Sequence, residues 1–260
     1  MLKTRLISAI VAIPIVIGAV YLGGVWFAVG AGLIALIAGW EFGQMMKAGG
    51  YQTAPLFTLV LIVVLMYTSY QPWPALLSFA LTAILLISLA WQLFQTAPHP
   101  TATWALTLAG GLYIGWGLGH LVALRQRPDG QAWVWLALLA TWGADTLAYF
   151  VGRAIGQHKL WPRHSPKKTW EGLIGSIFGG IAGALLVAFF FGLNWGVALV
   201  IGAIIPIAGL FGDLSISMMK REVGVKDSSN LFPGHGGFLD RIDSLLFVSM
   251  VVFYYALWLG

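Results

Sequence analysis

Charged side chains concentrate in one stretch near the C-terminus, residues 213–243. The chain has 14 Lys and Arg and 9 Asp and Glu in 260 residues, and nine of these charges lie in this stretch: Asp213, Lys220, Arg221, Glu222, Lys226, Asp227, Asp240, Arg241 and Asp243. Apolar runs flank it on both sides. A charged segment between apolar runs is costly unless it has a function. We therefore expect the chemistry of the protein here.

The spacing of these polar residues predicts a binding site with a metal ion. If the preceding apolar run continues as a helix, four polar side chains share one face at i, i+4, i+7 and i+8: Asp213, Ser217, Lys220 and Arg221. Asp240 and Asp243 lie one helical turn apart. Carboxylates among many cations, with no cysteine and few histidines, favour oxygen-liganded Mg²⁺ over zinc. A loop of solvated charge is the alternative.

A second candidate is Asp145, which lies inside an otherwise apolar run within residues 141–153. An unpaired carboxylate in a membrane span is unfavourable, so it should meet a cation, a metal or a hydrogen-bond donor. Pairing with a neighbouring helix that serves packing alone is the structural alternative.

A third cluster is the loop of residues 152–172. Two hydroxyls and two ammonium groups lie directly before an expected helix start: Ser165, Lys167, Lys168 and Thr169. Backbone N–H groups at a helix start together with lysines suit phosphate binding. Lysines beside a membrane helix also bind anionic lipid headgroups, and the spacing leaves both interpretations open.

Taken together, the clusters supply carboxylates for a divalent ion and cations for several phosphates at a membrane surface. Phosphoryl or nucleotidyl transfer fits this set, because that chemistry depends mainly on positioning and charge neutralisation. We expect no nucleic acid partner.

The elements that position these residues are membrane helices. Hydrophobic residues make up 59% of the chain and charged residues 9%, whereas soluble domains carry about 25% charged residues. The fold class is therefore all-α and polytopic, with about nine spans of near-membrane length. We place them near residues 6–22, 24–39, 55–70, 74–95, 103–124, 131–151, 173–192, 195–212 and 242–260.

The distribution of basic residues predicts the orientation of these spans. In the nine-span arrangement only Arg125 and Arg127 fall on one side. The other side receives the remaining twelve of the 14 basic residues. Cytoplasmic loops are enriched in Lys and Arg. The polar loops 152–172 and 213–241 are thus expected on the cytoplasmic side of the cytoplasmic (inner) membrane.

The N-terminal part has few charges and predicts a packing role. We divide the chain into a packing and dimerisation region, 1–102, and a catalytic region, 103–260. Glu41 follows Trp40 near the end of a span and is interpreted as an interface anchor. Small residues allow close helix approach, which favours a homodimer; the glycines concerned are Gly18, Gly23, Gly30, Gly32 and Gly39.

The polar stretch resembles the signature of a known family. It runs from Ser217-Met-Met-Lys220-Arg221 through Lys226-Asp227-Ser-Ser to His235-Gly-Gly-Phe-Leu-Asp240-Arg241-Ile-Asp243. This pattern is similar to that of the phosphatidate cytidylyltransferases, also called CDP-diacylglycerol synthases. The segments Ser165-Pro-Lys-Lys-Thr-Trp-Glu-Gly172 and Asp145-Thr-Leu-Ala-Tyr149 also match the family.

The resemblance implies cytidylyl transfer from CTP to phosphatidic acid, a membrane lipid, with Mg²⁺ and room for a second, monovalent cation. It implies that Mg²⁺ is held by Asp213 and Asp240, with Asp145 and Asp243 as further ligands or partners of ligands. Phosphates would be neutralised by Lys167, Lys168, Lys220, Arg221 and Lys226. The remaining substrate-binding residues would be Ser165, Thr169, Asp227, His235, Gly236, Gly237 and Arg241.

Two other functions remain open at this stage. A membrane kinase that uses CTP on a lipid alcohol would share the hydrophobic build, but it would need a carboxylate base and would release CDP. A transporter would place polar residues and broken helices at the midplane of paired segments. The polar residues gather toward one membrane face instead, which disfavours transport.

Overall fold

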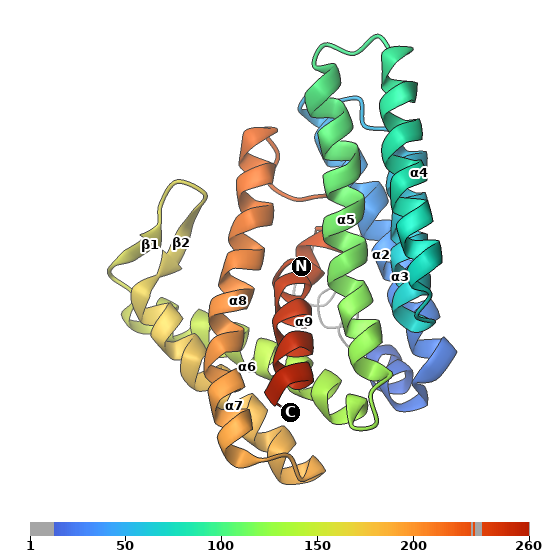
Figure 1. The fold of residues 1–260 in the computed structure, drawn as a ribbon. Helices are drawn as coiled ribbons and strands as arrows, with labels where there is room; N and C mark the ends of the chain where they lie inside the picture. The colour runs from blue at the N-terminus through green and yellow to red at the C-terminus, as the bar shows by residue number, and fades with distance from the viewer. Residues whose placement is uncertain (1–12, 230, 232–235, 260) are drawn as a thin grey trace. The chain divides into compact units, whose positions relative to one another are not determined.

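The structure, a computed structural model, describes residues 13–229, 231 and 236–259 and is built almost entirely of α-helices (Figure 1). After a helical segment Ile13–Leu22, the elements are α2 (Gly24–Ala48), α3 (Pro55–Tyr70), α4 (Pro74–Leu93), α5 (Pro100–Arg125), α6 (Gly130–Ile155), β1 (Lys159–Trp161), β2 (Ser165–Thr169), α7 (Trp170–Phe191), α8 (Trp195–Glu222) and α9 (Leu239–Leu259). The predicted all-α class is confirmed. The short β1–β2 hairpin is an addition that the sequence did not predict.

Within the described residues, seven helices are long and apolar enough to cross a membrane: α2, α4, α5, α6, α7, α8 and α9. Ile13–Leu22 and Pro55–Tyr70 are apolar but shorter, and a perpendicular span needs about 20 residues. The chain is therefore a polytopic membrane protein. The number of nine spans stays a prediction, and the beginning of the expected first span lies outside the described residues.

The chain forms two compact units. Unit 1 comprises residues 1–126 and 219–242, and unit 2 comprises residues 127–218 and 243–260. Helices α8 and α9 each contribute to both units. These units are defined by packing, so the functional division at residue 102 stays a prediction.

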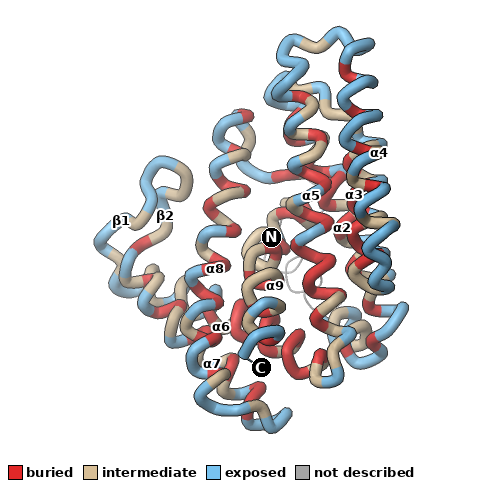
Figure 2. The backbone as a smooth tube through the Cα atoms, viewed as in Figure 1, coloured by how far each residue is buried: buried red, intermediate tan, exposed pale blue. Residues whose placement is uncertain are grey.

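In unit 1, helices α2, α3, α4 and α5 lie side by side (Figure 1), and α5 contacts both α2 and α3. Three glycines on α5 allow this approach. A Cβ on Gly111 or Gly115 would lie 3.0 Å from backbone atoms of α3, and a Cβ on Gly119 would lie 2.6 Å from the Ser69 hydroxyl. Much of α5 is buried as a result (Figure 2).

Most of the glycines that we expected to bring helices together do not lie at helix–helix contacts within the described residues. A Cβ added at Gly18, Gly30 or Gly32 would meet no described residue outside its own helix within 4 Å, whereas a Cβ at Gly23 would meet the Arg125 side chain and one at Gly39 the Ile62 side chain. Helix α4 is also exposed over most of its length (Figure 2), with large apolar side chains such as Phe79 and Leu86 on its surface. Apolar exposure of this kind is expected where a helix faces lipid.

Unit 2 is organised around the crossing of α6 and α7. A Cβ on Gly143 would lie 2.5 Å from the carbonyl oxygen of Gly179, and a Cβ on Gly183 would lie 2.5 Å from that of Leu139. Any larger residue would therefore separate the two backbones. The β1–β2 hairpin joins α6 to α7 and is antiparallel, with Lys159 opposite Thr169.

Helix α8 is longer than its predicted span of 195–212. It continues without interruption to Glu222 and contains Pro206. The condition for the predicted polar face, a helix that persists beyond residue 212, is thus met. A hydrogen bond of 3.0 Å from the Ser217 hydroxyl to Asp213 Oδ1 joins the first two members of that face.

Candidate active site

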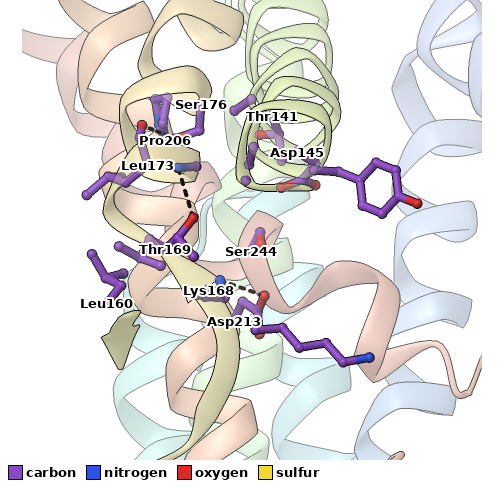
Figure 3. A pocket seen from close by; sticks show the side chains of 18 of the residues that line it. Thr141, Asp145, Leu160, Lys168, Thr169, Leu173, Ser176, Pro206, Asp213 and Ser244 are labelled. Atoms are coloured by element: carbon purple, nitrogen blue, oxygen red, sulfur yellow. Dashed lines mark hydrogen bonds and ion pairs between the residues drawn. The ribbon is translucent and has the colours of Figure 1, made fainter. Parts of the chain in front are cut away.

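A cavity of about 520 Å³ opens in unit 2, within the size range of small-molecule sites. Helices α6, α7, α8 and α9 and the β1–β2 hairpin all contribute to its lining. Its polar and charged members are Thr141, Asp145, Tyr149, Arg153, Lys167, Lys168, Thr169, Ser176, Asp213 and Ser244. Apolar side chains from α7 and α8 complete it, so a charged ligand and an apolar one can both contact its walls (Figure 3).

The central pair of this cavity is Lys168 and Asp213. Lys168 Nζ lies 2.8 Å from Asp213 Oδ2, and the two side chains are 24% and 33% exposed (Figure 3). An ion pair with this exposure is only weakly stabilising because water and salt screen it. Its lysine can therefore exchange the carboxylate for a phosphate at little cost.

The hairpin places the two lysines, and the start of α7 fixes the hairpin. Thr169 caps α7: its hydroxyl accepts a hydrogen bond of 3.1 Å from the N–H of Gly172, a favourable arrangement at a helix start. At the other strand, His158 Nδ1 lies 2.6 Å from Glu171 Oε1. The predicted basic cluster thus belongs to a cavity wall, with Lys167 and Lys168 both lining it.

Asp145 lines the same cavity from α6, one turn after Thr141. Arg153 reaches the cavity from the end of α6 and donates a hydrogen bond of 2.8 Å to the Tyr149 hydroxyl. The cavity therefore has two carboxylates and three cations, a set that can neutralise a polyphosphate once a divalent cation is added.

Asp240 lies in unit 1 and is the centre of a second, buried cluster. Its Oδ1 accepts a hydrogen bond of 2.6 Å from Lys220 Nζ, and the two side chains are only 7% and 9% exposed. Its Oδ2 accepts three hydrogen bonds: 2.8 Å from the Ser228 N–H, 2.9 Å from the Ser228 hydroxyl and 3.0 Å from the Gly237 N–H.

Glu41 belongs to this buried cluster, so its interpretation as an interface anchor is wrong. The residue is fully buried, and its carboxylate accepts hydrogen bonds from Ser228, Ser229, Phe238 and Leu239. A carboxylate with four protein donors does not need water. We call Glu41, Lys220, Ser228, Ser229 and Asp240 the Glu41–Asp240 network.

The other predicted residues have varied places. Four of them have exposed side chains in unit 1: Arg221, Lys226, Asp227 and Arg241. Arg221 donates a hydrogen bond of 3.0 Å to the Val225 carbonyl.

The last predicted residues lie in loops or at the ends of elements. Gly236 has a φ of +78°, and a Cβ there would lie 2.6 Å from Asp240 Oδ2. Ser165 begins β2, and Asp243 Oδ1 accepts from the Ser244 N–H at 2.7 Å. His235 lies outside the described residues.

The predicted Mg²⁺ ligands fit that ion to different degrees. Among the residues with described positions, no three His, Asp or Glu side chains gather as a metal site. Mg²⁺ commonly binds through one or two carboxylates plus substrate phosphates and waters, and Asp213 and Asp145 line one cavity in that manner. Asp240 already accepts three hydrogen bonds at Oδ2, which leaves Oδ1, the oxygen paired with Lys220.

Several residues of these two clusters escaped the sequence-based prediction: Glu41, Ser228, Ser229, Arg153, Tyr149 and Ser176. Glu41 had a detectable signal. It is one of nine acidic residues in the chain and it interrupts an apolar run, and ionisable residues in such runs are commonly functional. Tyr149, Ser228 and Ser229 lie within the segments that resemble the family, but no role was assigned to them. Ser176 has no comparable signal, because only the packing of α7 against α6 brings it to the cavity.

Comparison with known proteins gives a consistent result. Residues 3–259 match the model of the Cytidylyltransferase family. The phosphatidate cytidylyltransferase of Pseudomonas aeruginosa is 37% identical over 280 residues, covering 99% of this chain and 97% of that protein. The phosphatidate cytidylyltransferase of Staphylococcus haemolyticus is 36% identical over 251 residues, covering 95% and 96%.

The match extends over nearly the whole chain, so it includes both compact units as well as the polar stretch on which the resemblance was based. A further relative, the phosphatidate cytidylyltransferase of Staphylococcus aureus, is 33% identical over 95% of this chain. The predicted family is confirmed: this chain is a member of the cytidylyltransferase family.

Proposed function

We propose that this protein transfers the cytidylyl group of CTP to phosphatidic acid, giving CDP-diacylglycerol and pyrophosphate for phospholipid synthesis. The main structural support for this assignment is the cavity of unit 2. Cationic, carboxylate and apolar side chains line it together, and membrane helices contribute most of them. The relatives named phosphatidate cytidylyltransferase support the same substrates.

The reaction does not require a strong general base. The phosphate of phosphatidic acid is a monoester with a second pKa of about 6 and is largely ionised near neutral pH. One of its oxygens forms a bond to the α-phosphorus of CTP, while the bond from that phosphorus to the bridging oxygen of the β-phosphate breaks. Pyrophosphate leaves with the electron pair. The barrier comes mainly from repulsion between two anions and from the in-line geometry.

The cations of the cavity reduce that repulsion. Lys168 exchanges Asp213 for a phosphate oxygen, and Lys167 and Arg153 approach the same space from the hairpin and α6. Asp213 and Asp145 would hold Mg²⁺ in this cavity. Bound Mg²⁺ would neutralise phosphate charge and orient the polyphosphate.

The residues of unit 1 have supporting roles in this proposal. Arg221, Lys226 and Arg241 have exposed side chains that we assign to phosphate binding, and Asp227 and Gly236 belong to the same polar stretch. Asp240 and Lys220 form a buried ion pair. In this proposal Asp240 Oδ1 is the oxygen of that pair that would contact a metal ion. We also propose that the active site faces the cytoplasm at the inner membrane and that the protein is a homodimer.

Purified protein in lipid-supplemented detergent, with phosphatidic acid, Mg²⁺ and CTP labelled at the α-phosphate, tests the assignment. We expect the label in the lipid fraction and stoichiometric release of pyrophosphate. A lipid labelled only from γ-labelled CTP, with free CDP, would instead identify a lipid kinase. Lys168→Gln, which cannot neutralise phosphate, should reduce the transfer, whereas Ser215→Ala on α8 should not.

A further inference from the structure

We propose that Glu41 is a positioning residue for the active site: from α2 it holds together the two chain segments that carry Ser228 and Asp240. This inference rests on the proposed function, because those segments belong to the polar stretch assigned to it. It concerns a side chain in the part of the chain predicted to serve packing alone.

Both oxygens of the Glu41 carboxylate are used. Oε1 accepts from the Ser229 hydroxyl at 2.6 Å and from the Phe238 N–H at 3.0 Å. Oε2 accepts from the Leu239 N–H at 2.8 Å and from the Ser228 hydroxyl at 3.3 Å. The donors are 187 to 198 residues away in sequence, so the contacts exist only in the folded unit.

The partners of Glu41 lie at the beginning of a helix. Leu239 is the first residue of α9, and Phe238 precedes it. The first N–H groups of a helix lack partners within the helix, and the helix dipole favours a negative charge there. Glu41 therefore caps α9 from a different helix, and its charge is compensated by these N–H groups and by the Ser229 hydroxyl.

Ser228 links this cap to Asp240. Its hydroxyl lies 2.9 Å from Asp240 Oδ2 and 3.3 Å from Glu41 Oε2. A hydroxyl has one hydrogen, so the shorter distance favours donation to Asp240 at any moment. The Ser228 N–H also donates to Asp240 Oδ2. A displacement of Glu41 would therefore reach Asp240 through Ser228 and through the first turn of α9.

Gly237 shows how closely the segments approach. A Cβ on Gly237 would lie 2.5 Å from each oxygen of Glu41, while its N–H donates to Asp240 Oδ2 at 3.0 Å. Only a residue without a side chain fits between these two carboxylates. The position of Asp240, and with it the Lys220 ammonium at 2.6 Å, depends on this arrangement.

Glu41→Gln tests the proposal without creating a cavity. Glutamine retains one acceptor oxygen but places an NH₂ donor against existing donors. We expect kcat for cytidylyl transfer to fall about 10- to 100-fold, with a smaller change in KM for CTP, since Glu41 acts through Asp240 rather than on substrate. Amide hydrogen exchange in the peptides that contain Ser228 and Leu239 should become faster.

Thr58→Val is the matched control. Thr58 is buried in the same unit, and its hydroxyl donates to the Thr107 carbonyl at 2.9 Å. Its loss should lower thermal stability while kcat per folded molecule and exchange near Ser228 stay as in the unsubstituted protein. Glu41→Gln with the same behaviour as this control would show a purely structural role and overturn the proposal.

Should Glu41→Gln not fold, Ser229→Ala removes a single donor and is judged by the same two measurements, with a smaller loss of kcat expected. The exchange measurement needs no turnover. If the unsubstituted protein shows no cytidylyl transfer, the proposed function fails. If Glu41→Gln does not speed exchange near Ser228 and Leu239, this inference fails, whatever the activity.

Discussion

The two lysine–aspartate pairs of this protein have nearly the same geometry and very different surroundings. Lys168 and Asp213 are 2.8 Å apart and are 24% and 33% exposed, whereas Lys220 and Asp240 are 2.6 Å apart and 9% and 7% exposed. Water can replace either partner of the first pair. It cannot do so for the second, whose aspartate also accepts three hydrogen bonds from Ser228 and Gly237.

The difference indicates two separate tasks, one in each compact unit. The exposed pair lines the cavity of unit 2, and in the function proposed above its lysine binds a phosphate and its carboxylate would hold Mg²⁺. The buried pair, with Glu41, maintains the conformation of the polar stretch. Similar distances therefore do not imply similar roles; burial and the number of additional donors distinguish them.

The largest effect is expected from Lys220→Met, which leaves Asp240 buried without its cation. Removing one partner of a buried pair typically costs about 3–5 kcal/mol, so the thermal unfolding temperature in detergent should drop by several degrees, and transfer activity should be lost with it. Lys226→Met, which removes an exposed cation, should leave the unfolding temperature unchanged. An unchanged unfolding temperature for Lys220→Met would remove the distinction between the pairs.

Asp213→Asn should separate activity from stability. We expect the rate of cytidylyl transfer at saturating Mg²⁺ to fall about 100-fold or more. The free energy of unfolding should change by less than about 1 kcal/mol, because the pair with Lys168 is solvated. Steady-state kinetics and thermal unfolding of the same preparation check both. Full Mg²⁺-dependent activity in this variant would exclude Asp213 as a metal ligand.

An intermediate effect is expected from Gly237→Ala. The added Cβ would lie 2.5 Å from both oxygens of Glu41, and relief of such a clash costs about 1–3 kcal/mol. Thermal unfolding and activity should both decrease, since the backbone near Asp240 must move. Gly32→Ala is the control: a Cβ at that position in α2 would meet no described residue outside the helix within 4 Å, and alanine should be neutral or slightly stabilising there.

The smallest effect is expected from His158→Ala at the base of the hairpin. His158 Nδ1 contacts Glu171 at 2.6 Å, but the His158 side chain is 78% exposed. Such a contact contributes at most about 1 kcal/mol, so we expect a small rise in KM for CTP and an unchanged kcat. A large loss of kcat would mean that the hairpin positions Lys168 more directly than the structure indicates.

The helices were largely predictable from the sequence. Long apolar runs ended by polar residues, Pro or Gly predict membrane helices, and the prediction for Pro55–Tyr70 matches both ends of α3. Helix α2 extends nine residues past its predicted end at 39. That extension contains Glu41, whose charge suggested an interface because the sequence gives no sign of the four donors that surround it.

The class of chemistry could also be predicted from the sequence alone. The residue types and spacing around Asp145, Lys168, Asp213 and Asp240 indicated phosphate and Mg²⁺ chemistry, because few other uses explain so many charges beside apolar runs. Only the tertiary structure decides that Asp213 lines an open cavity and that Asp240 is buried. Burial depends on the donors and helices that distant segments bring together, as Glu41 and Ser228 do across 187 residues, and no local pattern encodes that.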